Sequence, residues 1–231
     1  VRSRIVPDLF QLSLSRVHLD DIKGVPLIGV KEPALHGWNM AFKRAVDIIV
    51  SALLLVLLGP LMLLIALAIK LDSSGSVLFQ QTRVGRGGQL FTLYKFRSMR
   101  LGAESEVEHL SRYNEADGPL FKMRNDPRVT RVGRIIRKLS LDELPQLYNV
   151  LRGEMSVVGP RPALPSEVVQ YEEWHRKRLD VAPGLTGLWQ TSGRSDVTFD
   201  EMCLLDIYYA EQWSPLLDAT IVLKTIPTVL F

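Results

Sequence analysis

A long apolar segment with a proline near its middle constrains this chain more than any other feature. Residues Ile48 to Ile69 read IIVSALLLVLLGPLMLLIALAI and carry no charge, whereas charged residues stand close to both ends. Roughly 20 apolar residues are enough to cross a bilayer core of about 30 Å. We therefore expect the chain to work at a lipid bilayer.

Two conformations of this segment are compatible with its sequence. Pro60 has no N–H to donate to the carbonyl of Val56, and its ring crowds that carbonyl. One interpretation is a single membrane-spanning helix with a kink, which membranes tolerate. The other is a re-entrant helix-break-helix with its break at Gly59 and Pro60, whose arms of roughly 15 to 18 Å are too short to cross. Cationic residues at both ends do not favour a single crossing under the positive-inside rule.

The length of the chain suggests one globular domain besides the membrane element. With 231 residues, it can hold one domain of ordinary size. It starts at Val1 and shows no signal-peptide pattern, so we expect it to be part of a longer protein. We predict that residues 1–37 are the tail of a preceding domain and a linker, that 38–72 form the membrane element, and that 73–231 form the main domain.

Composition and charge exclude several classes of protein. Cys203 is the only cysteine, so no internal disulfide is possible, and four scattered histidines give no zinc-binding spacing. The net charge is only +3. Residues 124–138, however, hold five arginines and a lysine, which indicates an anionic partner such as phosphate or lipid headgroups. Aromatic residues do not alternate with the basic ones, so we expect no nucleic-acid partner.

The first half of the main domain shows both strand and helix patterns. We predict strands over 77–84 and 90–96 around a glycine-rich turn, a charged helical or mobile segment over 102–116, and helical structure from Val132 onward. Leucines from Leu141 to Leu151 have the spacing of one apolar helix face, which leaves Gln146 and Asn149 for the surface.

The second half alternates irregular segments with helices. Three prolines make residues 157–165 an irregular loop, and residues 183–193 are interrupted by glycines. Helices are expected over 167–180 and 199–212. Residues 213–231 are apolar but too short and too charged to span, which favours an interfacial helix with Trp213 at headgroup depth. The predicted fold class is therefore mixed α/β (α+β).

The polar string SLDELPQL contains an acidic pair that has two interpretations. Ser140 followed three residues later by Glu143 fits a capping box, in which the acids only stabilise a helix start. Pro145 conflicts with that register, and a helix that begins at Asp142 removes the conflict. In either register both acids lie at a helix N-terminus beside Arg137.

Such a pair can also perform phosphoryl chemistry. An aspartate can attack phosphorus and form an acyl-phosphate. A neighbouring glutamate can hold Mg²⁺, which neutralises phosphate oxygens. Arginines bind phosphate in bidentate fashion. The combination of acids, arginines and a membrane segment favours phosphoryl transfer to a lipid.

Five motifs resemble those of a known family. They are KFRSM (Lys95–Met99), SLDELPQL (Ser140–Leu147), SVVGPRP (Ser156–Pro162), PGLTGLWQ (Pro183–Gln190) and SGRSD (Ser192–Asp196). In this order they resemble the bacterial monotopic phosphoglycosyl transferases, the polyprenyl-phosphate sugar-1-phosphate transferases that begin capsule, O-antigen and exopolysaccharide synthesis. The likeness covers residues 38–231, the C-terminal catalytic part of the longer members. Residues 1–33 resemble the end of their preceding nucleotide-binding-like domain.

The resemblance implies a two-step reaction. Asp142 would attack the β-phosphate of a nucleoside diphosphate-sugar, and polyprenyl phosphate would then take the phosphosugar. Glu143 would bind Mg²⁺. The resemblance also implies a re-entrant helix, although members often carry serine before the proline, where this chain has Gly59.

The resemblance also implies roles for six further residues. Lys95, Arg97 and Arg137 would bind phosphate or order the acids. Arg161, between two prolines, would face the nucleotide, and Arg194 and Asp206 would belong to the substrate pocket. Simpler interpretations are strand-end surface charges for the first two, an ordinary loop arginine at 161, and an ion pair with a nearby cation for Asp206.

We therefore predict an enzyme that transfers a hexose-1-phosphate from a UDP-sugar, UDP-glucose or UDP-galactose, to undecaprenyl phosphate. Its catalytic domain would lie on the cytoplasmic face of the bacterial inner membrane, attached by the re-entrant helix and by interfacial amphipathic helices. A homo-oligomer is compatible with the sequence. The alternative is a non-catalytic membrane module that binds anionic lipid or acts as a scaffold.

Overall fold

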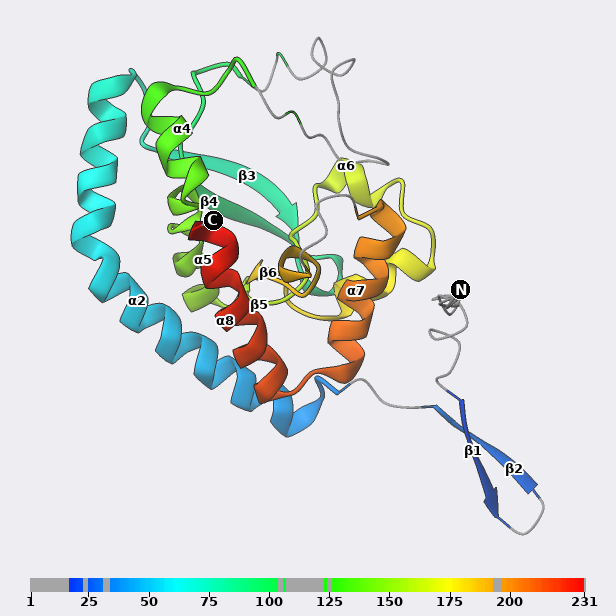
Figure 1. Cartoon of the computed structure of the whole chain (residues 1–231). Helices are drawn as coiled ribbons and strands as arrows, with labels where there is room; N and C mark the ends of the chain where they lie inside the picture. Colours follow the sequence, from blue (N-terminus) through cyan, green and yellow to red (C-terminus); the bar gives the residue numbers. More distant parts are fainter. Residues whose placement is uncertain are drawn as a thin grey trace, which may run out of the picture.

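Helices and short strands alternate in the computed structural model, which describes residues 17–22, 25–30, 34–103, 106, 123, 126–192 and 197–230 (Figure 1). The strands are β1 (Val17–Ile22), β2 (Val25–Val30), β3 (Leu78–Val84), β4 (Leu90–Phe96), β5 (Ser156–Val158) and β6 (Gly184–Thr186). The α-helices are α2 (Gly37–Asp72), α4 (Arg131–Lys138), α5 (Gln146–Arg152), α6 (Pro165–Val168), α7 (Phe199–Gln212) and α8 (Pro215–Leu230). Short 3-10 turns are η1 (Arg86–Gly88), η3 (Leu141–Glu143), η4 (Trp174–Asp180) and η5 (Trp189–Thr191). The mixed α/β class is confirmed. The predicted segment 102–116 lies almost wholly outside the described residues.

The apolar segment forms most of α2, a single helix of 36 residues that contains Pro60. Figure 1 shows it as a continuous ribbon along one side of the molecule that changes direction midway. Its middle is exposed, with Val56 at 77% and Leu63 at 73% of full accessibility. Among the described residues it is the one helix long and apolar enough to cross a membrane, judged by length and composition alone. Such an exposed apolar surface suits lipid better than water.

Both ends of α2 are attached to the rest of the molecule. Near its start, the Arg44 guanidinium donates to the carbonyls of Val150 and Leu151 at the end of α5, at 2.5 and 2.7 Å. Near its end, Asp72 accepts from the backbone N–H of Val132 at the start of α4. Ile69 also lies in a cluster with residues of β4 and α4. The contacts with the rest of the molecule are therefore made near both ends of the helix, while its middle is largely exposed.

Strands β3 and β4 form the predicted antiparallel hairpin, closed by η1. Opposite residues share a face, so that Arg83 pairs with Phe91 and Phe79 pairs with Lys95. Phe91 and Leu93 on this face are buried. The inner face of the hairpin therefore carries Lys95 toward one end and Arg83 toward the other.

Helix α5 lies against β4 through a buried amide. The Asn149 side chain donates to Thr92 O at 2.7 Å and accepts from Tyr94 N at 3.1 Å. Asn149 and Gln146 were expected at the surface from their position on the helix. Both side chains are buried instead. The reason is that β4 offers unpaired backbone groups on this side, which a side-chain amide can satisfy.

Segments predicted to be irregular contain a short parallel pair of strands. Ser156 pairs with Gly184 and Val158 with Thr186, so the loop predictions for 157–165 and 183–193 are wrong at these positions. Close approach of two glycines allows the pairing, since a Cβ on Gly184 would lie 2.1 Å from Gly159 N. Glycines that read as loop signals are here required for packing.

The helix expected over 167–180 is two short pieces, α6 and η4. Between them Tyr171 is buried against Phe199 and His175, and this packing interrupts the helix. By contrast, α7 has the predicted bounds, 199–212. Thr198 caps it by accepting from Glu201 N, as in a capping box.

The predicted C-terminal helix is confirmed as α8, but Trp213 is not at an exposed headgroup depth. Trp213 is buried, and its Nε1 donates to Asp218 at 3.0 Å. Asp218 also accepts from Lys43 of α2 and from the Tyr209 hydroxyl. Asp218, whose charge interrupts the apolar sequence, is therefore the shared acceptor of several polar side chains. The buried Trp213 is one of these donors, through its Nε1. Exposed apolar residues of α8, such as Leu216 and Leu223, still suit an interface.

Candidate active site

The acidic pair lies in a tight turn between α4 and α5. Asp142 and Glu143 belong to η3, and Pro145 stands at the start of α5. Ser140 has φ of 51°, the left-handed region that non-glycine residues rarely adopt. Its side chain caps nothing, because Glu143 N donates to the backbone carbonyl of Ser140 instead. The capping-box interpretation is therefore wrong, and the strained turn presents both acids.

Lys95 of β4 reaches this turn across the hairpin. Its Nζ lies 2.7 Å from Glu143 Oε1, and both side chains are about one quarter to one third exposed. The inward orientation of Lys95 follows from its place on the inner face of β4. Lys95 is thus part of the acidic site rather than a free strand-end charge.

Burial shapes the chemistry of Asp142. Desolvation is the largest effect, and it raises the pKa of the Asp142 carboxyl from 3.8 to about 6. Lys95 and Arg137 lower this pKa, while the neighbouring Glu143 raises it. A carboxylate with a raised pKa is still ionised at pH 7 and is more basic than an ordinary aspartate, which suits a nucleophile.

Two predicted arginines have different roles in the structure. Arg137 lies exposed on α4, where its charge acts on Asp142. Arg97 is buried and donates to the carbonyls of Ser73 and Ser74, both at 2.7 Å. The Arg97 guanidinium therefore holds the segment after α2, and the charges that act on Asp142 do not include it.

Arg161 stands in an irregular loop whose geometry Glu167 sets. Glu167 is buried, lies 3.1 Å from the Arg161 guanidinium, and accepts from Leu164 N at 2.9 Å. The Arg161 side chain stays about one quarter exposed. It can therefore contact a ligand while its orientation is fixed from inside.

Asp206 takes part in a buried ion pair. Its Oδ2 lies 2.5 Å from the Arg178 guanidinium, and both side chains are 1% exposed. Desolvation raises the pKa of Asp206 to about 6 despite this partner. Arg178 also donates to the Arg161 carbonyl at 3.4 Å, so that Asp206 acts on the loop only indirectly. Arg194 lies outside the described residues.

Arg83 also belongs to this region, although its role was not predicted from the sequence. This residue of β3 shares the inner face of the hairpin with Lys95 and donates to the Pro162 carbonyl at 2.9 Å. Strand alternation was the signal that could have found it, since a cation at an inward position needs a partner.

The residues present fit a magnesium ion. Two adjacent carboxylates supply the hard oxygen ligands that Mg²⁺ prefers, and a phosphate substrate would supply more. Lys95 contacts Oε1 of Glu143, so that Oε2 is the oxygen that could bind the metal ion. In the described part of the chain, His, Cys, Asp and Glu form no cluster of three or more that could hold a metal by themselves. An ion here would thus depend on the substrate for part of its coordination.

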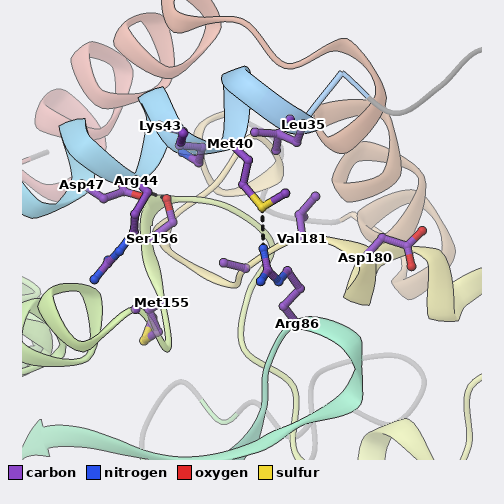
Figure 2. A pocket seen from close by; sticks show the side chains of 14 residues that line it. Leu35, Met40, Lys43, Arg44, Asp47, Arg86, Met155, Ser156, Asp180 and Val181 are labelled. Carbon is purple, nitrogen blue, oxygen red and sulfur yellow. Dashed lines mark hydrogen bonds between the residues drawn. The ribbon is translucent and has the colours of Figure 1, made fainter.

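A cavity of about 480 Å³ lies elsewhere, between the start of α2 and η1. Figure 2 shows the Arg86 side chain reaching the sulfur of Met40 across it. Neither acid of the pair lines it. It is therefore separate from the site formed by the acids.

Comparisons with known proteins found a matching family model and several similar proteins. The family model described as bacterial sugar transferase matches residues 38–231. The chain is 46% identical over 191 residues to the exopolysaccharide production protein ExoY of Rhizobium meliloti, with 81% of this chain and 84% of ExoY covered. It is 45% identical over 193 residues to the galactosyl transferase CpsE of Streptococcus agalactiae, with 83% of this chain and 43% of CpsE covered. It is 38% identical over 230 residues to the UDP-glucose:undecaprenyl-phosphate glucose-1-phosphate transferase of Escherichia coli, with 96% of this chain and 47% of that protein covered. The chain thus spans less than half the length of the last two.

Proposed function

The chain belongs to the bacterial sugar transferase family, and from this premise we propose that it transfers a hexose-1-phosphate from a UDP-sugar to undecaprenyl phosphate and releases UMP. The names of its relatives support glucose or galactose as the sugar. The observation that carries the proposal is the ionised but desolvated Asp142, held beside Glu143, Lys95 and Arg137.

Asp142 is the proposed nucleophile of the first step. An oxygen of its carboxylate forms a bond to the β-phosphorus of the donor, while the bond from that phosphorus to the bridging oxygen breaks. UMP leaves with this oxygen, and the phosphosugar stays on Asp142. In the second step an oxygen of undecaprenyl phosphate attacks the same phosphorus, which frees the Asp142 carboxylate and gives the diphosphate-linked sugar. Dividing the transfer in this way replaces one hard displacement with two easier ones.

Neighbouring residues stabilise the charge of the phosphates. Lys95 and Arg137 bring positive charge to Asp142, and Arg161 offers a partly exposed guanidinium further along the site. Glu143 and Asp142 are the residues that would hold Mg²⁺, which when bound neutralises phosphate oxygens and the leaving group. Lys95 also orients Glu143 through their 2.7 Å contact.

We propose that α2 is re-entrant and that the catalytic domain faces the cytoplasm. The support for a re-entrant helix is that Arg44 near one end and Asp72 near the other both contact the same domain. A helix that crossed the bilayer would place these two residues on opposite sides. The exposed middle around Pro60 would then dip into the lipid, and α8 would lie in the interface.

A donor assay tests the reaction. The protein in detergent or nanodiscs is given single UDP-sugars and undecaprenyl phosphate, and UMP release is measured with the Asp142→Asn variant as control. We expect release with UDP-glucose or UDP-galactose and none from the variant. Mass spectrometry with a donor alone should find one phosphosugar covalently attached. Retained turnover in Asp142→Asn would overturn the assigned nucleophile, and lipid binding without UMP release would favour a non-catalytic membrane module.

Cysteine labelling tests the topology. Cysteines introduced at Met40 and Ser74 in sealed inverted vesicles should both react with an impermeant reagent from the outside, which is the cytoplasmic face. The native Cys203 is buried, and its replacement removes background labelling. Reaction from opposite sides would exclude the re-entrant helix.

A further inference from the structure

The loop that carries Arg161 is fixed through its backbone carbonyls. Gly184 N donates to Pro160 O at 2.8 Å, and Val84 N donates to Ala163 O at 2.9 Å. Between these two, the Pro162 carbonyl accepts from the Arg83 guanidinium at 2.9 Å. Prolines cannot donate a backbone hydrogen bond, so such a loop depends on its carbonyls for attachment. Arg83 is the side chain that holds the residue after Arg161.

Arg83 is a largely buried cation whose hydrogen bonds go to neutral groups. Its terminal nitrogens donate to the Pro162 carbonyl at 2.9 Å and to the Gln81 amide oxygen at 2.6 Å, which are both neutral. Its Nε is buried with no partner. In the part of the chain that the structure describes, no carboxylate lies within ion-pair distance of Arg83. A buried charge whose hydrogen bonds go only to neutral groups is costly, and an anionic ligand bound nearby would lower that cost.

The charges around Arg83 belong to the candidate active site. Arg161 repels it, whereas Glu167 and Glu143 attract it, and burial with this repulsion lowers the pKa of Arg83 to about 10. The guanidinium groups of Arg83 and Arg161 are thus held near each other, because Arg83 binds the carbonyl of Pro162, the residue after Arg161. An anionic substrate between the acid pair and Arg161 would relieve their repulsion.

We propose that Arg83 is a positioning residue of the donor site, which fixes the Arg161 loop and adds positive charge behind it for the diphosphate of the donor. This inference rests on the proposed function. Arg83 acts through the Pro162 carbonyl rather than by direct contact, since its Nε is covered and its other nitrogens are engaged. Its loss should therefore weaken donor binding more than it slows the chemical step.

Donor binding in the catalytically inactive background isolates this role. UDP-glucose binding is measured by calorimetry for Asp142→Asn alone and with Arg83→Gln, Arg161→Gln or both. We expect Arg83→Gln to weaken binding about 10-fold, and to add less than about 3-fold once Arg161 is already replaced. The matched control is Arg86→Gln, which removes the same charge from an exposed position on the same hairpin. We expect the control to bind like its parent.

Steady-state kinetics and a conservative variant separate positioning from folding. With Asp142 present, Arg83→Gln should raise the donor KM about 10-fold and leave kcat within about 3-fold. Arg83→Lys, which keeps the charge but cannot bridge both partners, should recover part of the binding. If Arg83→Gln does not fold, as judged by thermal unfolding, then Arg83→Lys carries both measurements and should show an intermediate loss.

Three outcomes would overturn the inference. The first is donor binding unchanged in Arg83→Gln, the second is a loss that multiplies fully with that of Arg161→Gln, and the third is an equal loss in Arg86→Gln. Failure of the proposed function is distinguishable, because it would show as no UMP release by the unmodified protein with any UDP-hexose.

Discussion

Replacing the proposed nucleophile should make the protein more stable while it abolishes activity. Burial raises the pKa of Asp142 from 3.8 to about 6. Ionisation of this carboxyl therefore lowers the free energy of unfolding, which makes the folded protein less stable. Each pKa unit corresponds to about 1.4 kcal/mol, and the shift of roughly two units therefore costs about 3 kcal/mol at neutral pH. The Asp142→Asn variant keeps the shape of the side chain and removes the desolvated charge. We expect it to be more stable than the unmodified protein by up to about 3 kcal/mol at pH 7.5.

The sign of the pH dependence follows from the same shift. Between pH 3.8 and about 6 the folded state binds more protons at Asp142 than the unfolded state, so stability falls as the pH rises through this window. At pH 5 roughly half of the cost should remain, and the gain from Asp142→Asn should shrink by about half. Above about pH 7, where the carboxyl is ionised in both the folded and the unfolded state, the gain should be constant.

Thermal unfolding in nanodiscs at pH 5.0 and 7.5 measures this effect. For a chain of this size, each kcal/mol corresponds to about 2 to 4 °C in the unfolding midpoint, so we expect an increase of up to about 6 to 12 °C at pH 7.5. Asp126→Asn is the matched control of opposite sign, because a hydrogen bond from Arg128 lowers the pKa of the Asp126 carboxyl. That variant should unfold at a lower temperature at pH 7.5. A midpoint that falls in Asp142→Asn, or a gain that stays the same at both pH values, would refute the assigned desolvation.

Three further predictions concern the site and its support. Lys95→Met removes a charge that lowers the pKa of Asp142. The acidic limb of the pH–rate profile for UMP release should therefore move from about pH 6 to higher pH, and an unmoved limb would contradict the electrostatic coupling between Lys95 and Asp142. Gly133→Ala should destabilise the protein by about 2 kcal/mol or more, since the new Cβ would lie 1.9 Å from the Ser98 carbonyl oxygen. Denaturant unfolding measures this change, and an unchanged free energy of unfolding would mean that α4 can shift. Chelation of Mg²⁺ with EDTA should abolish UMP release and added Mg²⁺ should restore it, whereas Glu143→Gln should raise the Mg²⁺ concentration needed for half-maximal rate; release that persists in EDTA would exclude the ion.

Local patterns in the sequence predicted the elements that depend on near neighbours. The antiparallel hairpin of β3 and β4, the bounds of α7 and the long apolar helix all follow from residues that are adjacent along the chain. Alternation, capping and apolar length act over short distances, so a single segment contains the whole signal. The five motifs indicated the family for a related reason, because each is a short run of adjacent residues whose order can be read directly from the sequence.

Patterns failed where a residue takes its partner from a distant segment. Ser140 and Glu143 look like a capping box, yet the turn is set by backbone bonds and by Lys95, which comes from another element. Trp213 looks interfacial, but it is buried in an apolar cluster with Val158 and Ile221, where its Nε1 donates to Asp218.

The amino-acid sequence alone determined that an acidic pair, several arginines and a long apolar helix occur in one chain of this family. Tertiary structure alone decided which of these charges meet: Lys95 at Glu143, Arg97 at the end of α2, and Arg83 at the Arg161 loop. The physical reason is that electrostatic and hydrogen-bond energies depend on distances and burial in space. Separation along the sequence does not specify either quantity.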